Sequence, residues 1–503
     1  MSHLPILPIF LSMVVGAALL LMRGSMDFKR GISLLATFAQ LPLAIMLLLQ
    51  ASQGTLVYTL GNWAPPFGIV LVVDRLAALM LVITAVLACA ALLYAVRGDD
   101  AAGRNFHPLF QFQLMGITGA FLTGDLFNLF VFFEILLIAS YALLLHGVGS
   151  ARVRAGLHYV LLNLTGSALF LIAVGTLYGV LGTLNMADLA VRISELPRTE
   201  QPLVGAAGML LLVVFGLKTA VFPLYFWLPR AYAASSAPVA ALFAIMTKVG
   251  LYSILRVYTL MFGEQADTLA QLVNGWLWPL TLVTLVLGAV GALAAATLTG
   301  LIAYLVVVSV GTMLAGLAMG TPEALRATLF YLMHSTWITG ALFLFAGVLQ
   351  RVRGPRFAAR LVAGPSLPRP MLLGGVFFLA AMSIVGMPPL SGFIGKLLLL
   401  SAAGTGELAA WLYPVVLGSG LLSLVALSRA GTTLFWRQTD VAASGEPVDG
   451  LRMTALLLLL LASPLLVVFA EPVLTYLAAT ADQLLQPQSY IDAVLPAHSE
   501  VIP

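Results

Sequence analysis

The sequence predicts an all-α, polytopic integral membrane protein with about fourteen transmembrane helices. Hydrophobic residues make up 61% of the 503 residues and charged residues only 9%, against about 25% charged residues in soluble domains. The apolar residues are gathered in runs of about twenty, the length of a helix that crosses a bilayer. Because short loops separate these runs, no large extramembrane domain is expected.

The expected spans follow one another along the chain. Their approximate bounds are residues 4–22, 31–50, 69–96, 107–122, 125–146, 156–181, 203–229, 237–260, 272–297, 299–319, 326–349, 371–402, 411–435 and 453–479. The fourth and fifth spans are so close together that they form a helical hairpin. No basic stretch precedes the first span, so it is interpreted as a retained helix and not as a signal peptide.

Basic residues give these spans an orientation. Of the 24 Lys and Arg residues, sixteen fall in or beside odd-numbered loops and four in or beside even-numbered loops. Cytoplasmic loops carry the excess of basic residues in membrane proteins. We therefore expect a multi-pass protein of the bacterial inner (plasma) membrane, with both termini outside the cytoplasm.

Prolines interrupt two of the expected helices. Pro223 lies in the seventh span, and Pro388 and Pro389 lie in the twelfth. Proline removes a backbone donor and frees carbonyls, which a membrane tolerates only where protein or water satisfies them. Two discontinuous helices at matching positions are typical of transporters built from inverted repeats.

The two breaks lie five spans apart, which predicts two inverted five-helix repeats. The expected divisions are residues 1–106 for helices one to three, 107–260 for the first repeat, 272–435 for the second repeat, and 436–503 for the last helix and tail.

Ionisable residues at mid-membrane depth are the candidate functional site. Glu134, Lys218 and Lys248 lie near the midpoints of their spans, His334 lies inside the eleventh span, and Lys396 follows the break in the twelfth. A charge at the bilayer centre costs roughly 2.5–3.5 kcal/mol on insertion scales, so such residues usually face a polar interior. All five can share one layer, and we interpret them as a proton pathway.

Lysine suits proton exchange in an apolar environment. An arginine stays protonated there, whereas a lysine can release its proton. A nearby carboxylate stabilises the ammonium form, so a change at Glu134 would alter how tightly Lys218 holds its proton. All three central basic sites are lysines, and the arginines are mostly confined to loops.

Structural roles are the alternative for the same residues. The lysines could satisfy carbonyls freed at the helix breaks, and His334 could be a polar contact of Ser335 and Thr336. Asp74 adjoins Arg75, which favours a local or intersubunit ion pair over a role in conduction.

Several functional classes lack their motifs. The sequence contains no phosphate-binding Walker loop, no dinucleotide glycine fingerprint and no His-Glu-x-x-His zinc motif. Cys89 is the single cysteine, which excludes an internal disulfide and a cysteine-ligated cluster within this chain. We expect a transporter subunit and not an enzyme, with no cofactor and no nucleic-acid partner. No cluster of acids within one span identifies a metal or sodium site.

Several stretches resemble the proton-translocating, antiporter-like subunits of Mrp-type Na⁺/H⁺ antiporters, respiratory complex I and membrane-bound hydrogenases. They are GDLFNLFVFFE at 124–134, Lys218 with Pro223, WLPRA at 227–231, Ala237-Pro238, and KVGLY at 248–252 followed by Arg256. The likeness covers nearly the whole chain. Within this family the first stretch and the lysine at position 396 look most like the D-type subunit of Mrp antiporters.

The resemblance implies a function and partners. Glu134, Lys218, Lys248 and Lys396 match the proton-path residues of the family. The chain would be one subunit of a hetero-oligomer in the lipid membrane that exchanges H⁺ for Na⁺, with K⁺ or Li⁺ as other possible cations. The alternative is a proton-pumping subunit of a redox complex, either a complex I-type NADH:quinone oxidoreductase or a membrane-bound hydrogenase.

Overall fold

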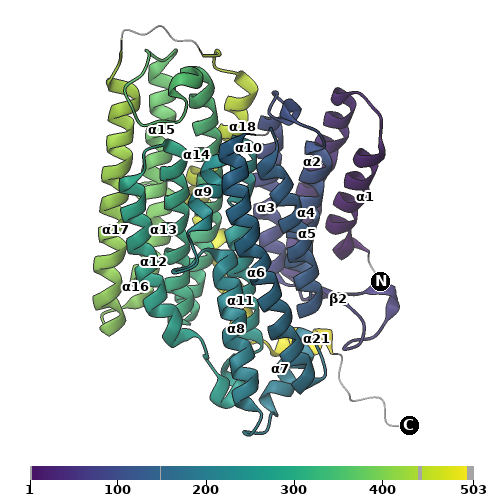
Figure 1. Ribbon diagram of the computed structural model, residues 1–503. Helices are drawn as coiled ribbons and strands as arrows, with labels where there is room; N and C mark the ends of the chain where they lie inside the picture. Colours follow the sequence, from purple (N-terminus) through teal and green to yellow (C-terminus); the bar gives the residue numbers. More distant parts are fainter. Residues whose placement is uncertain (1–2, 148, 440–444, 496–503) are drawn as a thin grey trace.

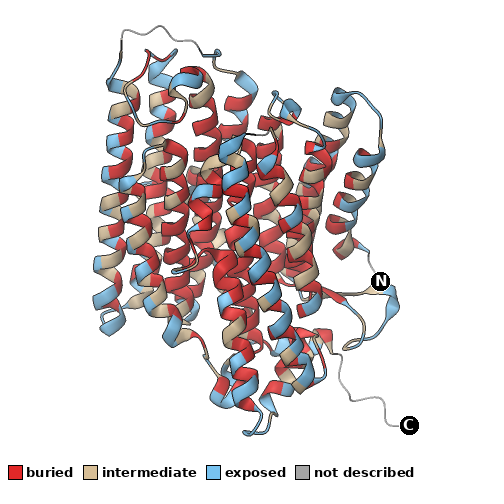
Figure 2. Ribbon diagram, in the orientation of Figure 1, coloured by how far each residue is buried: buried red, intermediate tan, exposed pale blue. Residues whose placement is uncertain are grey.

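A bundle of long, roughly parallel helices forms the structure, a computed structural model that describes residues 3–147, 149–439 and 445–495 (Figure 1). The N-terminal helices α1 and α2 lie at one edge of the bundle, and α15 and α17 lie at the opposite edge. Buried residues fill the interior, and exposed residues lie on the outer helices and at both ends (Figure 2).

The elements of the first half are η1 Leu4–Ile6, α1 Leu7–Leu21, α2 Met26–Ala51, β1 Leu56–Thr59, η2 Leu60–Asn62, β2 Val70–Val73, α3 Arg75–Ala95, η3 Asp100–Ala102, α4 Phe106–Leu122, α5 Leu126–Leu145, α6 Ser150–Leu181, α7 Met186–Ser194, α8 Gln201–Thr219, α9 Trp227–Ala234, α10 Ala237–Phe243 and α11 Met246–Leu260. Those of the second half are η4 Glu264–Leu269, α12 Asn274–Ala294, α13 Leu298–Met319, α14 Pro322–Phe357, α15 Pro370–Val385, α16 Ser391–Ala403, α17 Glu407–Gly431, η5 Thr432–Trp436, α18 Gly450–Leu460, α19 Ala462–Val468, α20 Ala470–Leu485 and α21 Gln488–Val494.

Twelve helical segments in the described ranges are long and apolar enough to cross a membrane. Two of them, Ala237–Leu260 and Pro322–Phe357, are wholly buried inside the protein over their most apolar windows. Two other expected spans are shorter: α4 has 17 residues, and the twelfth is divided into α15 and α16. The predominantly helical membrane fold is therefore confirmed.

The prediction of an all-α fold is wrong in one detail, because a β-hairpin precedes α3. Strands β1 and β2 pair antiparallel, with Leu56 opposite Val73. The expected span at 69–96 begins as this second strand, whose valines favour extended backbone. Helix α3 starts only at Arg75, where the Asp74 carboxylate accepts a hydrogen bond from the Ala77 amide at 2.9 Å.

Both proline-containing segments are breaks between helices. Pro223 lies between α8 and α9, and Pro388 and Pro389 lie between α15 and α16. The freed backbone groups find partners within the protein: the Trp227 indole donates to the Leu217 carbonyl at 3.0 Å, and Thr284 accepts from the Phe222 amide at 3.0 Å. The chain thus meets the requirement for irregular backbone in a membrane.

A third break was not expected. The predicted span at 237–260 is divided into α10, which ends at Phe243, and α11, which begins at Met246. Lys248 lies in the first turn after this break. Lys218 and Lys248 therefore lie within one turn of a helix end, and Lys396 lies in the second turn of α16, after the break at Pro388 and Pro389.

A buried ion pair holds α11 against the start of α3. The guanidinium of Arg256 donates to both carboxylate oxygens of Asp74, each at 2.7 Å. The ring of Tyr490 on α21 covers the guanidinium at 5.0 Å. Asp74 is not paired with its neighbour Arg75, which instead donates to the Ser52 carbonyl at 2.5 Å.

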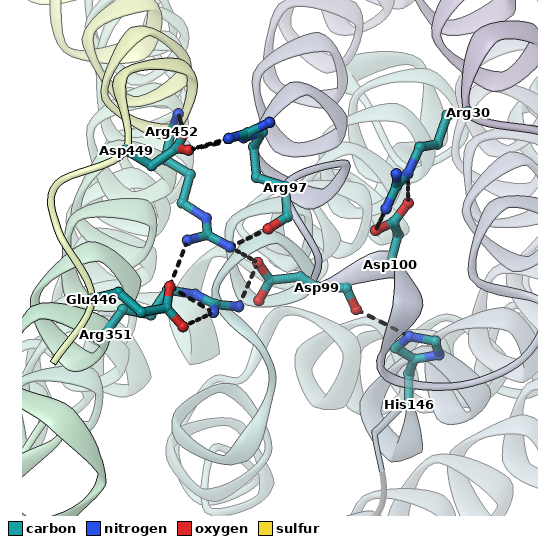
Figure 3. Close-up of polar contacts among 9 residues, drawn as sticks. All are labelled: Arg30, Arg97, Asp99, Asp100, His146, Arg351, Glu446, Asp449 and Arg452. Carbon is teal, nitrogen blue, oxygen red and sulfur yellow. Dashed lines mark hydrogen bonds and ion pairs between the residues drawn. The ribbon is translucent and has the colours of Figure 1, made fainter. Parts of the chain in front are cut away.

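A second set of charges ties helices together at the opposite end of the bundle (Figure 3). Asp99 accepts from Arg351 at 3.1 Å and from Arg452 at 3.5 Å. The same two arginines reach Glu446 at 3.2 and 3.4 Å. Burial raises the pKa of Asp99, and the two guanidiniums oppose that rise. These contacts join the loop after α3 to α14 and α18.

Asp100, beside Asp99, is fully buried and makes a separate cluster. It accepts from the Arg30 guanidinium at 2.6 and 2.9 Å and from the ring of His107 at 3.1 Å. Burial alone would raise the pKa of Asp100, but the hydrogen bonds from His107 and Arg30 outweigh it and hold this pKa well below its usual range. The cluster joins α2 and α4 through η3.

We predict that Asp100→Asn lowers the free energy of unfolding by about 2 kcal/mol, because charge-assisted hydrogen bonds to buried groups are lost. The exposed Asp27 also contacts Arg30, at 3.1 Å, and Asp27→Asn should change stability little. Thermal unfolding of the purified protein in detergent measures both effects.

The pH dependence of that loss has a defined sign. Since the folded-state pKa of Asp100 lies below the unfolded value of about 3.9, its stabilising effect is complete above about pH 4 and is lost as the pH falls towards the folded-state pKa. The stability difference between wild type and Asp100→Asn should be equal at pH 6 and pH 8. A stability difference between the two proteins that grows from pH 6 to pH 8 would contradict the lowered folded-state pKa of Asp100.

We also predict that Arg256→Met destabilises the protein by about 3–5 kcal/mol, because the buried Asp74 carboxylate is left without its partner. The double variant Asp74→Asn/Arg256→Met should recover most of this loss in the same unfolding assay. If the double variant were as unstable as the single one, the guanidinium would act by packing and not by charge.

Candidate functional site

The first part of the candidate site is a chain of hydrogen bonds from Glu134 to Lys218. The Ser167 hydroxyl donates to the Glu134 carboxylate and also to the Asn163 carbonyl. The Lys218 ammonium donates to the side chain of Asn163 at 3.3 Å and to its carbonyl at 3.4 Å. Acid and base are thus joined by two polar residues of α6.

Local structure fixes this arrangement. Helix α5 begins at its cap Asp125, which accepts from the Asn128 amide at 2.8 Å and so sets the helical register that carries Glu134. Lys218 lies in the last turn of α8, where the carbonyl end of the helix dipole favours a cation. The centroid of the Phe133 ring lies 5.8 Å from the ammonium group of Lys218. At this distance the ring attracts the cation as well as packing against its neighbours.

The second part of the site surrounds the break between α15 and α16. The Lys396 ammonium donates to the carbonyl of Val385, the last residue of α15, at 2.6 Å. The His334 ring contacts the Ser391 hydroxyl at 2.8 Å, and Ser391 contacts Ser463 at 2.7 Å. His334 is fully buried, and these contacts connect α14, α16 and α19.

Lys248 lies between the two parts. Its side chain is fully buried, and its ammonium has no hydrogen-bond partner among the residues that the structure describes. Lys248 and Lys396 both lie within electrostatic range of His334. Gly250 packs against Thr219, so closely that an added Cβ would lie 2.5 Å from the threonine hydroxyl, and this contact brings α11 against the end of α8.

The structure therefore places all five predicted residues inside the bundle, with Lys218, Lys248 and His334 buried and Glu134 and Lys396 half-buried. Sequence reasoning missed the polar residues between them, namely Asn163, Ser167, Ser391 and Ser463. The spacing of Asn163 and Ser167 by four residues on one helix face was the available signal.

Fixed carbonyls also suit a structural role for the lysines, since each ammonium of a broken helix can cap freed backbone groups. Lys396 makes such a contact, whereas Lys218 donates to the Asn163 carbonyl inside the uninterrupted helix α6. The contacts of Lys218 are compatible with proton exchange and with a structural role. Variants at Lys218 distinguish these two roles. In the described ranges, no group of three or more His, Cys, Asp or Glu residues could hold a metal ion.

Comparisons with known proteins agree with this architecture. Residues 123–422 match the family model described as NADH:quinone oxidoreductase/Mrp antiporter, TM. The chain is 42% identical to a probable K⁺/H⁺ antiporter subunit, of the D type, from Rhizobium meliloti, over 99% of this chain and 98% of that protein. It is 39% identical to the D-type Na⁺/H⁺ antiporter subunit of Bacillus subtilis, over 98% of this chain and 100% of that protein.

A solved structure gives the same result. A chain of the Mrp complex from Dietzia sp. DQ12-45-1b superposes with a TM-score of 0.86 and 29% identity, over 98% of this chain and 99% of the other. The chain belongs to the NADH:quinone oxidoreductase/Mrp antiporter family and, within it, to the D-type subunits of Mrp-type antiporters.

Proposed function

We propose that this chain is the proton-translocating D-type subunit of a multisubunit monovalent cation/proton antiporter in the bacterial inner membrane. The hydrogen-bonded chain from Glu134 to Lys218 is the observation that carries the proposal. The names of the relatives support antiport, with K⁺ for one and Na⁺ for another. The other subunits of the complex are its partners, and it acts as a transporter subunit without catalytic residues.

The proposed route runs through the interior, parallel to the membrane. The proposed passage between Glu134 and Lys218 follows Ser167 and Asn163. The Ser167 hydroxyl donates to Glu134, and the Ser167 hydroxyl and the Lys218 ammonium both donate to the Asn163 carbonyl. A water molecule would complete the link where an amide cannot itself carry the proton. Transfer from the ammonium to the carboxylate leaves both groups neutral and the net charge unchanged, and the opposite charges of the two groups favour the ionised pair.

The route continues to the second half through Lys248, His334 and Lys396. Because Lys248 has no fixed hydrogen-bond partner among the described residues, its ammonium is free to exchange with either side. Its charge acts on His334, and so does that of Lys396. Like charges oppose one another, so in this proposal protonation of one group favours release from the next.

The proposal includes fourteen spans in two inverted five-helix repeats, divided at 107–260 and 272–435. Equivalent caps support it: Asp125 at the start of α5 and Thr297 at the start of α13 each accept from the amide three residues later. Each cap also forms an isolated antiparallel bridge, to Asn185 and Arg360 respectively. The charge bias of the loops supports termini outside the cytoplasm.

A subunit of a redox complex is the second candidate, since the matching family includes NADH:quinone oxidoreductase subunits. Vesicles that carry the whole gene cluster distinguish the two. For an antiporter, added Na⁺ or K⁺ should dissipate a preformed pH gradient only when this chain is present. A pH gradient that instead forms on addition of an electron donor and acceptor would favour the redox complex.

We predict that Lys218→Ala and Lys218→Arg each lower cation-dependent proton transport at least tenfold while the complex still assembles. Alanine removes the exchangeable proton, and arginine retains the charge but stays protonated. Transport is measured in the same vesicles, and assembly by co-purification of the companion subunits. Normal transport in Lys218→Arg would show that only the positive charge is needed, as a scaffolding role requires.

We further predict that Asn163→Leu and Ser167→Ala each lower transport several-fold, because either change interrupts the link between Glu134 and Lys218. The matched control is Thr165→Ala, an exposed threonine of the same helix whose hydroxyl donates to the Leu161 carbonyl. If all three variants transport equally, the proton does not pass along α6.

A further inference from the structure

A groove outside the proton path lies between α15, α17 and η5. Its volume is about 620 Å³, within the range of about 300–1,000 Å³ typical of small-molecule sites. Phe377 and Phe435 pack against each other in the groove, with ring centroids 5.5 Å apart. Met371 and Trp436 also line it and are largely exposed, at 92% and 76%.

One end of this apolar groove is basic. Arg369 directly precedes the lining residues Pro370 and Met371, and Arg437 directly follows the lining residue Trp436. Both arginines are exposed, and neither makes an ion pair among the residues that the structure describes. Between Arg369 and Arg437 the sequence has one acid, Glu407, at the other end of α17, and Asp440 follows Arg437 by three residues.

The backbone holds these two basic segments together. The Gly364 amide donates to the Arg437 carbonyl at 3.3 Å, and the Thr439 amide donates to the Gly364 carbonyl at 2.9 Å. The N-terminus of α15 follows Arg369 and adds the positive end of a helix dipole. Positive charge therefore gathers at the level where the apolar groove opens.

We propose that this groove is a binding site for an anionic phospholipid. An acyl chain occupies the apolar groove against Phe377 and Phe435, and the headgroup phosphate lies near Arg369 and Arg437. Basic pockets between membrane helices recognise acidic headgroups in this way. The charge favours a lipid over an apolar helix of a companion subunit, because such a helix would leave both arginines without partners.

Quenching of Trp436 fluorescence tests the proposal in the assembled complex. The complex is placed in nanodiscs with brominated phosphatidylglycerol or brominated phosphatidylcholine, and the emission of a Trp436→Phe variant is subtracted. Bromine on the anionic lipid should quench Trp436 more strongly. Arg369→Gln and Arg437→Gln should each weaken this preference about fivefold, the attraction of one surface arginine for acidic lipid.

Filling the groove gives a second, independent variant. An added Cβ at Gly375, which lines the groove, would meet nothing within 4 Å, so Gly375→Leu should be accommodated and should reduce quenching by both lipids. The matched control is Gly418→Leu, on α17 but not among the lining residues and equally open. Arg198→Gln, an exposed arginine at the other end of the bundle, is the control for charge.

Mass spectrometry of co-purified lipid provides a readout that does not depend on the tryptophan. Wild-type complex should retain phosphatidylglycerol or another acidic lipid, and Arg369→Gln/Arg437→Gln should lose it. Equal quenching by the two lipids, or an unchanged preference in the double variant, would overturn the proposal. If neither brominated lipid quenched Trp436 in the assembled complex, the proposal would also be overturned. That result would show that a companion subunit covers the groove.

Discussion

Burying an ammonium group in an apolar interior is the constraint on which this structure depends. A lone charge there is unstable unless backbone or side-chain oxygens replace water. Interrupted helices supply such oxygens, because their ends leave carbonyls unpaired. Lys396 uses the last carbonyl of α15, and Lys218 lies in the last turn of α8. The break between α15 and α16 thus supplies an oxygen to Lys396, whereas the oxygens that contact Lys218 come from Asn163 of the continuous helix α6.

Arginines and lysines are separated by role as well as by place. Arg256, Arg351 and Arg452 are paired with carboxylates and join helices. The three interior lysines have no ion pair among the described residues; amide and carbonyl oxygens contact two of them, and Lys248 has neither. A permanent charge balanced by an acid makes a stable joint, whereas an unbalanced lysine can gain or lose its proton. The ion-paired arginines thus join helices near the two ends of the bundle, and the three lysines lie inside apolar spans without a carboxylate partner among the described residues.

The sequence predicted the features that depend on single residue types. Apolar runs predicted the helices, prolines predicted two of the breaks, and ionisable residues inside apolar runs identified the five candidate site residues. It could not reveal the break before Lys248, because no proline marks it and tertiary contact at Gly250 accompanies it. The pairing of Asp74 with Arg256 joins positions 182 residues apart, and no local pattern encodes such a distance. The sequence predicted a membrane span that starts with the strand Val70–Val73, because a short buried strand has the same apolar composition as a buried helix.

The caps Asp125 of α5 and Thr297 of α13 have the same geometry, so positions in the two helices can be compared by their distance from the cap. Nine residues after Asp125 stands Glu134, and nine residues after Thr297 stands Val306, a fully buried aliphatic side chain. Only the α5 hairpin therefore has a carboxylate nine residues after its helix cap. A positive charge beside the α5 hairpin meets an opposite charge at this position, whereas one beside the α13 hairpin meets an aliphatic side chain.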